Sequence, residues 1–116
     1  MTHEPYWTTV LTDELTGPAL DAAVARALNA TAPYTLPYST QWDLLGPVMQ
    51  QYRIDVCYDQ SYDAWRATHA DFDRGIAVRC YGPTPSVAVM RCLCNARLGP
   101  TVRVDLAATQ IGRAHV

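Results

Sequence analysis

The sequence contains no lysine: all nine of its basic residues are arginine, and they stand against eleven aspartate and glutamate residues. The net charge of −2 is spread along the chain, without a basic tail or a long run of like charge. This balance disfavours a protein that binds nucleic acid mainly through attraction to phosphates. We therefore do not expect nucleic acid to be the principal partner.

Long apolar runs are also missing. No stretch approaches the roughly 20 apolar residues that a membrane-spanning helix needs, and the first residues lack the charged and then apolar pattern of an export signal. We therefore expect no membrane partner and a location in the cytoplasm. With 116 residues, 49% of them hydrophobic, the chain should form one small domain around a single core.

A Cys-x-x-Cys pair is absent, although four cysteines are present: Cys57, Cys80, Cys92 and Cys94. Zinc fingers and ribbons need such closely spaced ligand pairs, so we predict no metal and no cofactor. A zinc site that joins some of these cysteines to His69 is the alternative. In a reducing cytosol the thiols should be free, and apolar neighbours predict that all but Cys57 are buried.

Catalytic motifs are likewise missing. The sequence has no phosphate-binding glycine loop, no nucleophile elbow and no metal-ligand pair. A nucleophilic Cys57 with His69 as its base is arithmetically possible, but strand alternation places the two side chains on opposite faces of the predicted hairpin. The sequence therefore predicts no catalytic residue and a protein that is not an enzyme.

What the sequence does contain is a clear order of helices. A helix is predicted after Leu15, with Thr16 as its N-cap and Pro18 in its first turn. Its apolar residues recur at helical spacing: Leu20, Ala23, Val24, Ala27 and Leu28. Residues 31–37 are predicted to be loop. A second helix should begin near residue 39 and break at Gly46-Pro47, with Pro47 opening the part that follows.

Three strands are expected next, because the apolar pattern changes from helical to alternating after Arg53. Residues 54–59 and 65–69 predict a hairpin around Gln60-Ser61, and residues 76–81 predict a third antiparallel strand. The polar face of these strands carries charges of both signs, and it is either merely solvated or a ligand surface. Its residues are Asp55, Cys57, Asp59, Arg66, Thr68 and Arg79.

A long, largely apolar helix is predicted after the third strand, capped by Thr84 and ending before Gly99-Pro100. Within it, the guanidinium of Arg91 needs a carboxylate or several carbonyl groups as partners. We predict a structural bridge from Arg91 to Asp21 on the first helix, with anion binding by Arg91 as the alternative. Residues 102–106 should add a short edge strand or trail over the surface.

Together these elements predict an α+β fold. A three-stranded antiparallel sheet has one face covered by the N-terminal helix and the long C-terminal helix, and a short broken helix precedes it. Residues 1–14 form an N-terminal extension, residues 15–106 the single domain, and residues 107–116 a tail. Because a common sequencing adapter encodes residues 111–116, we interpret them as read-through and exclude them from the fold.

Several short blocks give residues 15–105 a family resemblance. The blocks are Tyr38-Ser39-Thr40-Gln41-Trp42, Gly46-Pro47-Val48-Met49, Trp65-Arg66-Ala67, Gly82-Pro83-Thr84-Pro85 and Met90-Arg91-Cys92. With these blocks in this order, the sequence resembles the NinX-like family of phage proteins, whose function is unknown. The resemblance implies an accessory protein of a tailed phage or prophage, located in the host cytoplasm. It supplies no catalytic residue to carry over.

Three functions are therefore considered. We expect a non-enzymatic protein that binds a phage or host protein, with Tyr34, Tyr38 and Trp42 as candidate contacts, because aromatic side chains are effective binding anchors. The alternative is a weak nucleic-acid-binding module, since the order of helix, three strands and helix resembles double-stranded RNA-binding domains. Those domains use basic residues where the last helix begins, and here that start has none before Arg91. An enzyme is the least favoured.

Overall fold

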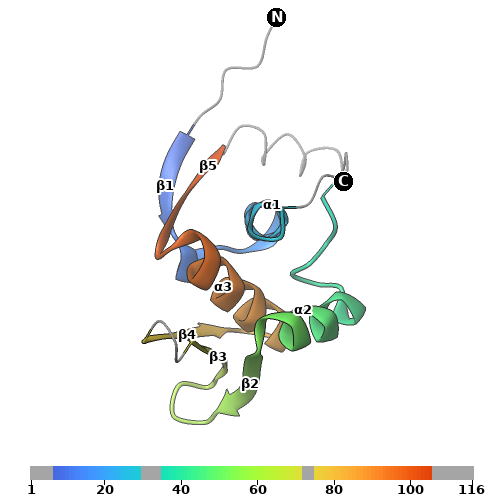
Figure 1. The fold of residues 1–116 in the computed structure, drawn as a ribbon, viewed down its shortest axis with the longest axis vertical. Helices are drawn as coiled ribbons and strands as arrows, with labels where there is room; N and C mark the ends of the chain where they lie inside the picture. The colour runs from blue at the N-terminus through green and yellow to red at the C-terminus, as the bar shows by residue number, and fades with distance from the viewer. Residues whose placement is uncertain (1–6, 30–34, 72–74, 106–116) are drawn as a thin grey trace, which may run out of the picture.

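The computed structural model describes residues 7–29, 35–71 and 75–105 (Figure 1). Its strands are β1 (Trp7–Leu11), β2 (Ile54–Asp59), β3 (Ala64–Asp71), β4 (Ile76–Gly82) and β5 (Thr101–Asp105). Its α-helices are α1 (Gly17–Ala27), α2 (Leu45–Tyr52) and α3 (Pro85–Leu98), and two short 3₁₀ helices are η1 (Thr12–Glu14) and η2 (Trp42–Leu44). The predicted α+β class is confirmed. The tail at 107–116, with its interpretation as read-through, lies outside the described residues.

Strands β2, β3 and β4 form the predicted antiparallel sheet, in that order. In the register, Ala67 on the central strand lies between Val56 and Cys80. Ile54, Ala67 and Cys80 are buried, because the face on which they lie is covered by α3. The predicted alternation is therefore confirmed, and the opposite face of the sheet, here called the outer face, is left to solvent.

Helix α3 lies at the centre of the molecule, with the sheet on one side and α1 on the other (Figure 1). Met90, Cys92, Leu93 and Cys94 are fully buried. The predicted cap is present, since the Thr84 hydroxyl accepts a hydrogen bond from the backbone N–H of Val87 at 3.1 Å. The apolar residues of α3 itself cover nearly its whole circumference, so a single packing layer cannot bury all of them.

This central position corrects one detail of the prediction. Helix α1 was expected to cover the sheet together with α3, but it packs mainly against α3 and β5. Its predicted core residues are buried there: Leu20, Ala23, Val24 and Ala27. The physical reason is that α3 exposes a second apolar side, which would face water if both helices lay on the sheet.

A second, two-stranded sheet joins the two ends of the described chain. β1 pairs with β5 antiparallel, and Val10 lies opposite Val102. Strand β5 is one of the two outcomes expected for residues 102–106, although it does not extend the three-stranded sheet. Strand β1 lies within the predicted N-terminal extension and was not anticipated, because its partner strand is 90 or more residues away in sequence.

The second helix differs from the prediction in where it breaks. The change from η2 to α2 falls between Leu44 and Leu45, and α2 continues through Gly46-Pro47. Pro47 is the third residue of α2, where a backbone N–H has no partner within the helix, so proline costs little there. Thr16 likewise precedes α1, but its side chain makes no capping hydrogen bond.

Candidate functional site

The three aromatic residues proposed as partner contacts have different environments. Tyr34 lies outside the described residues. Tyr38 is only 7% exposed and belongs to the core, whereas Trp42 on η2 is 66% exposed. Tyr38 is therefore corrected from a surface contact to a core residue, since its ring is buried where the chain enters η2. Of the proposed contacts in the described residues, Trp42 alone presents a large surface to a partner.

The predicted bridge between Asp21 and Arg91 is not formed. Arg91 instead donates to two backbone carbonyls, from Nε to Leu15 at 2.7 Å and from Nη1 to Tyr81 at 2.8 Å. It thereby ties α3 to the start of α1 and to the end of β4. Burial lowers the pKa of Arg91, while the charges of Asp13 and Glu14 oppose that shift.

Asp21 has a different role. Its Oδ1 accepts a hydrogen bond from the backbone N–H of Ser39 at 2.7 Å, which fixes the segment before η2 onto α1. Burial of the carboxyl raises the pKa of Asp21 above its ordinary value of 3.8, and the hydrogen bonds from Ser39 only partly offset this. The carboxyl is therefore a structural contact whose charged form is disfavoured by burial.

A pH prediction follows from this shift. Because the folded state holds the Asp21 proton more tightly, the contribution of Asp21 to stability is complete below pH 3.8 and falls as pH rises through the raised folded pKa. Asp21→Asn keeps the acceptor oxygen and removes the titration. We expect the free energy of unfolding of the wild type, relative to this variant, to decrease between pH 3.8 and neutrality in urea titrations. A difference that stays constant or increases with pH would contradict this assignment.

Other arginines also bind backbone carbonyls between elements. Arg97 donates from Nε to Ala27 at 2.9 Å, at the end of α1, and its guanidinium lies 5.4 Å from the ring centroid of Tyr52. Arg26 donates from Nη1 to the carbonyl of Arg103 on β5 at 3.1 Å. Three of the nine basic residues, namely Arg26, Arg91 and Arg97, therefore connect the packed layers. This use explains arginine positions to which the sequence assigned no role.

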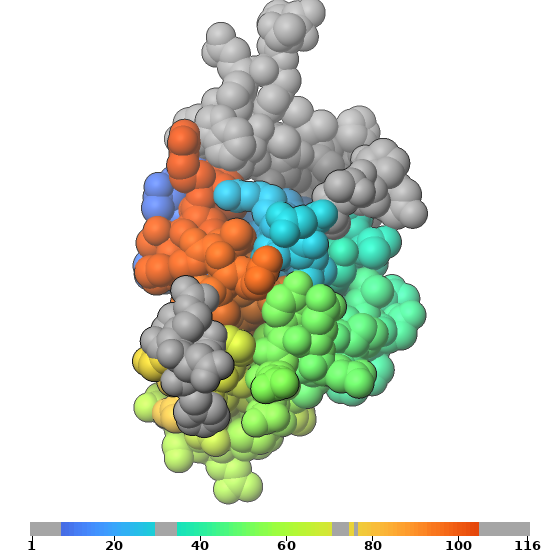
Figure 2. Space-filling model, in the orientation of Figure 1, coloured from blue at the N-terminus to red at the C-terminus, as the bar shows by residue number. Residues whose placement is uncertain are grey.

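Two pairs of aromatic side chains lie near the end of the β2–β3 hairpin. Tyr58 and Trp65 lie on the same face as Ala67, whereas Tyr81 lies opposite Arg66 on the outer face. We call Tyr58, Tyr62, Trp65 and Tyr81 the hairpin-end aromatics. Tyr62 is 69% exposed and Tyr58 is 45% exposed. The hairpin end lies at the opposite end of the molecule from β1 and β5 (Figures 1 and 2).

The exposed rings are held in place by contacts with their neighbours. The Tyr62 ring leans on Tyr81 with centroids 4.9 Å apart, and Tyr58 meets Trp65 edge to face at 5.5 Å. The Tyr58 hydroxyl donates a hydrogen bond to Asp63, which raises the pKa of Tyr58. Sequence reasoning missed this group because it treated the hairpin turn only as a reversal. The signal was available: Tyr62 follows Gln60-Ser61 directly, and turn residues are exposed.

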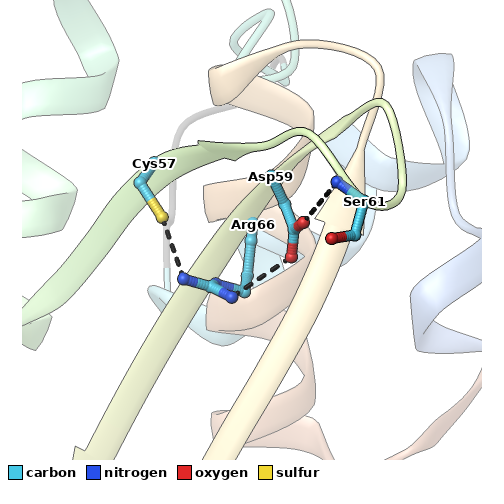
Figure 3. A network of polar contacts seen from close by, with 4 residues as sticks. All are labelled: Cys57, Asp59, Ser61 and Arg66. Carbon is cyan, nitrogen blue, oxygen red and sulfur yellow. Dashed lines mark hydrogen bonds and ion pairs between the residues drawn. The ribbon is translucent and has the colours of Figure 1, made fainter.

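A polar network on the outer face supports the same hairpin (Figure 3). The Arg66 guanidinium lies between two residues of β2, donating to Cys57 Sγ at 3.3 Å and to Asp59 Oδ2 at 3.2 Å. The other oxygen of Asp59 accepts from the N–H of Ser61 in the turn at 3.0 Å. The hydrogen bond with Cys57 is the largest of the causes that raise the pKa of Arg66. Arg66 and Asp59 thus form a cross-strand pair of opposite charge, as predicted for a solvated face.

The cysteines and His69 do not converge. Cys57 lies opposite Arg66 on the outer face, whereas His69 belongs to the other face and its Nδ1 is 2.8 Å from the Tyr52 carbonyl oxygen. Cys80, Cys92 and Cys94 are buried, as predicted. No group of three or more histidine, cysteine or acidic side chains within the described ranges is arranged to hold a metal ion.

A recess lies beside the outer face, at the end of α2. It is a hollow of about 440 Å³, open to solvent and lined by Met49, Arg53, Ile54, Asp55, Thr68 and Ala70. One arginine and one aspartate give it no dominant charge.

None of the helices in the described part of the chain combines the length and apolar character that crossing a bilayer requires.

A comparison with curated proteins finds no match. The family model described as "Bacteriophage P22, NinX" matches residues 34–97. This segment runs from Tyr34 through η2, α2 and the three-stranded sheet to the last turn of α3, and it contains every one of the hairpin-end aromatics. Because the match covers more than half of the 116 residues, the chain belongs to the NinX family of phage proteins.

Proposed function

We propose that this protein is a small phage accessory protein that binds a phage or host protein in the host cytoplasm and catalyses no reaction. Membership of a phage family supports the setting. The observation that carries the binding proposal is the exposure of Tyr62 and Tyr58 at the hairpin end. Tyrosine and tryptophan are the residues that most often dominate the energy of protein interfaces.

The supports of these rings strengthen the proposal. Tyr62 rests on Tyr81, and Tyr58 is fixed by Trp65 and Asp63. A ring that is already restrained loses little conformational entropy when a partner covers it, so more of its contact energy appears as affinity. Trp42, at 66% exposure, is a second exposed aromatic on a different element, and we assign it a secondary contact.

The separation of Cys57 from His69 supports a non-enzymatic role. Catalysis by a cysteine needs a base within hydrogen-bonding reach of the thiol, and these two side chains lie on opposite faces of the hairpin. The buried Cys94 thiol is also a poor nucleophile, because burial raises its pKa to about 12 and the thiolate is the reactive form.

We expect Tyr62→Ala to reduce recovery of the partner about tenfold or more, because removing a dominant aromatic contact costs at least roughly 1.4 kcal/mol of binding energy. The measurement is quantitative mass spectrometry of proteins retained by the tagged full chain from phage-infected cells. Leu11→Ala is the matched control, since Leu11 is also exposed, at 51%, but lies on β1. Thermal unfolding checks that both variants remain folded.

Three outcomes separate the hypotheses. Loss of the same captured protein with Tyr62→Ala but not with Leu11→Ala supports the hairpin end as the contact. Equal recovery by Tyr62→Ala and loss with Trp42→Ala would move the contact to η2 and overturn the assignment. Salt-sensitive retention of nucleic acid, with no specific protein, would favour the nucleic-acid alternative instead.

A further inference from the structure

Two buried thiols meet at the contact between α3 and the sheet. Cys80 lies on β4 opposite Ala67, on the face that α3 covers. Cys92 on α3 has its Sγ 3.7 Å from the carbonyl oxygen of Val78, two residues before Cys80. Cys80 and Asn95, which lies one turn after Cys92 on the same face of α3, donate to the same oxygen of Asp13 at 3.1 and 3.3 Å. The two thiols therefore face the same part of the contact, and each side chain is at most 1% exposed.

We propose that Cys80 and Cys92 are a redox modification site, a reduced thiol pair that closes to a disulfide and locks α3 onto β4 when the protein meets a low-molecular-weight disulfide. Disulfide formation requires the two β-carbons to approach closely, which only thiols already packed together can do without moving the backbone. Cys94 does not meet this condition, because it lies two residues further along α3, where the charge of Arg26 on α1 acts on it.

The reaction balances as two successive thiol exchanges. One protein thiol loses its proton, attacks a sulfur of the small disulfide and releases one small thiolate. The second protein thiol then loses its proton and attacks the mixed disulfide, forming the Sγ–Sγ bond and releasing the second thiolate. The protein loses two protons and two electrons, and the small disulfide is reduced to two thiols.

Access to the pair is provided at η1. The Cys80 thiol donates to Asp13 Oδ1 at 3.1 Å, and Asn95 Nδ2 donates to the same oxygen at 3.3 Å. Asp13 is itself exposed, although its neighbour Thr12 is fully buried, so we expect a small disulfide to reach Cys80 by displacing the three-residue η1. A disulfide has no S–H group, and oxidation therefore also removes the bond from β4 to η1.

The reduced state is protected by the same contacts. The hydrogen bond with Cys92, burial and the hydrogen bond to Asp13 raise the pKa of Cys80. A raised pKa keeps the thiol protonated, which slows its attack on disulfides. The pair should consequently remain reduced in an ordinary cytosol and respond only to sustained oxidation, whereas the exposed Cys57 reacts first.

The test uses the full chain, reduced and then incubated with oxidised glutathione under native conditions. Trypsin cleaves after Arg79, Arg91 and Arg97, so it separates residues 80–91 from residues 92–97. We expect these two peptides to be joined in the oxidised protein, with the mass of two hydrogen atoms lost and fragment ions placing the bond on Cys92. Cys94→Ala is the matched control and should retain the link in full.

Other results would overturn the proposal. A glutathione adduct on Cys57 with peptides 80–91 and 92–97 left unjoined would show that the pair does not close. Loss of the link in Cys94→Ala would show that Cys94, and not Cys92, forms the bond with Cys80. Both readings are made on chains that keep Cys80 and Cys92, so neither depends on whether a variant of the buried pair folds.

Discussion

Replacing Gly82 with alanine is expected to destabilise the protein by about 3 kcal/mol, at the upper end of the range for overpacked interiors. Gly82 is the last residue of β4 and is buried. A β-carbon added there would lie 2.7 Å from the backbone nitrogen of Ala88 and 3.1 Å from its Cα. The obstacle is backbone in the first turns of α3, which cannot rotate aside. Urea unfolding followed by fluorescence measures the effect.

Gly46→Ala is the matched control for this change. Gly46 lies in α2, is exposed, and has nothing within 4 Å of an added β-carbon. Alanine there should raise the free energy of unfolding by about 0.5 kcal/mol, because it restricts the unfolded chain and favours the helix. If both variants changed stability alike, the close approach of α3 to β4 would not be the reason for glycine at position 82.

Arg91→Met is expected to lower the free energy of unfolding by about 2 kcal/mol, since hydrogen bonds to charged groups contribute roughly 1.5–3 kcal/mol each and burial of the guanidinium offsets part of this. Methionine fills a similar volume but leaves the carbonyls of Leu15 and Tyr81 without their donor. These carbonyls come from two different layers of the fold. The measurement is again equilibrium unfolding in urea at neutral pH.

Arg79→Met provides the comparison on an exposed arginine of β4. A surface substitution of this kind changes stability by less than about 0.5 kcal/mol. An Arg91 variant no less stable than the Arg79 variant would refute the bridge to the two carbonyls. It would also reopen the anion-binding role, which a bound sulfate or phosphate detected by calorimetry would then have to support.

The two large effects share a structural origin in the block from Gly82 to Arg91. Thr84 caps α3, Gly82 allows the helix to approach β4, and Arg91 ties the helix to both neighbouring layers. Blocks from this stretch, Gly82-Pro83-Thr84-Pro85 and Met90-Arg91-Cys92, carried part of the family resemblance. Their residue types are therefore explained by the junction between strand and helix, without a catalytic role.

The candidate site was predicted less well than the fold. Tyr38 and Trp42 are four residues apart in a similar polar and aromatic segment, yet one is buried and the other is 66% exposed. No periodic pattern distinguishes them, because the segment is irregular and its burial depends on packing against other elements. Tyr58 follows the apolar alternation of β2, but it lies beyond the cover of α3 and remains exposed.

The sequence alone determined the elements whose signal is local. Alternation after Arg53 specified the three strands and their buried face, and the spacing of apolar residues specified α1 and α3, because side-chain direction repeats with each backbone geometry. Only the tertiary structure decided that α1 covers α3, that β1 meets β5, and that Arg91 binds carbonyls in place of Asp21. These choices depend on contacts between segments far apart in the chain, and such contacts leave no period in the sequence to read.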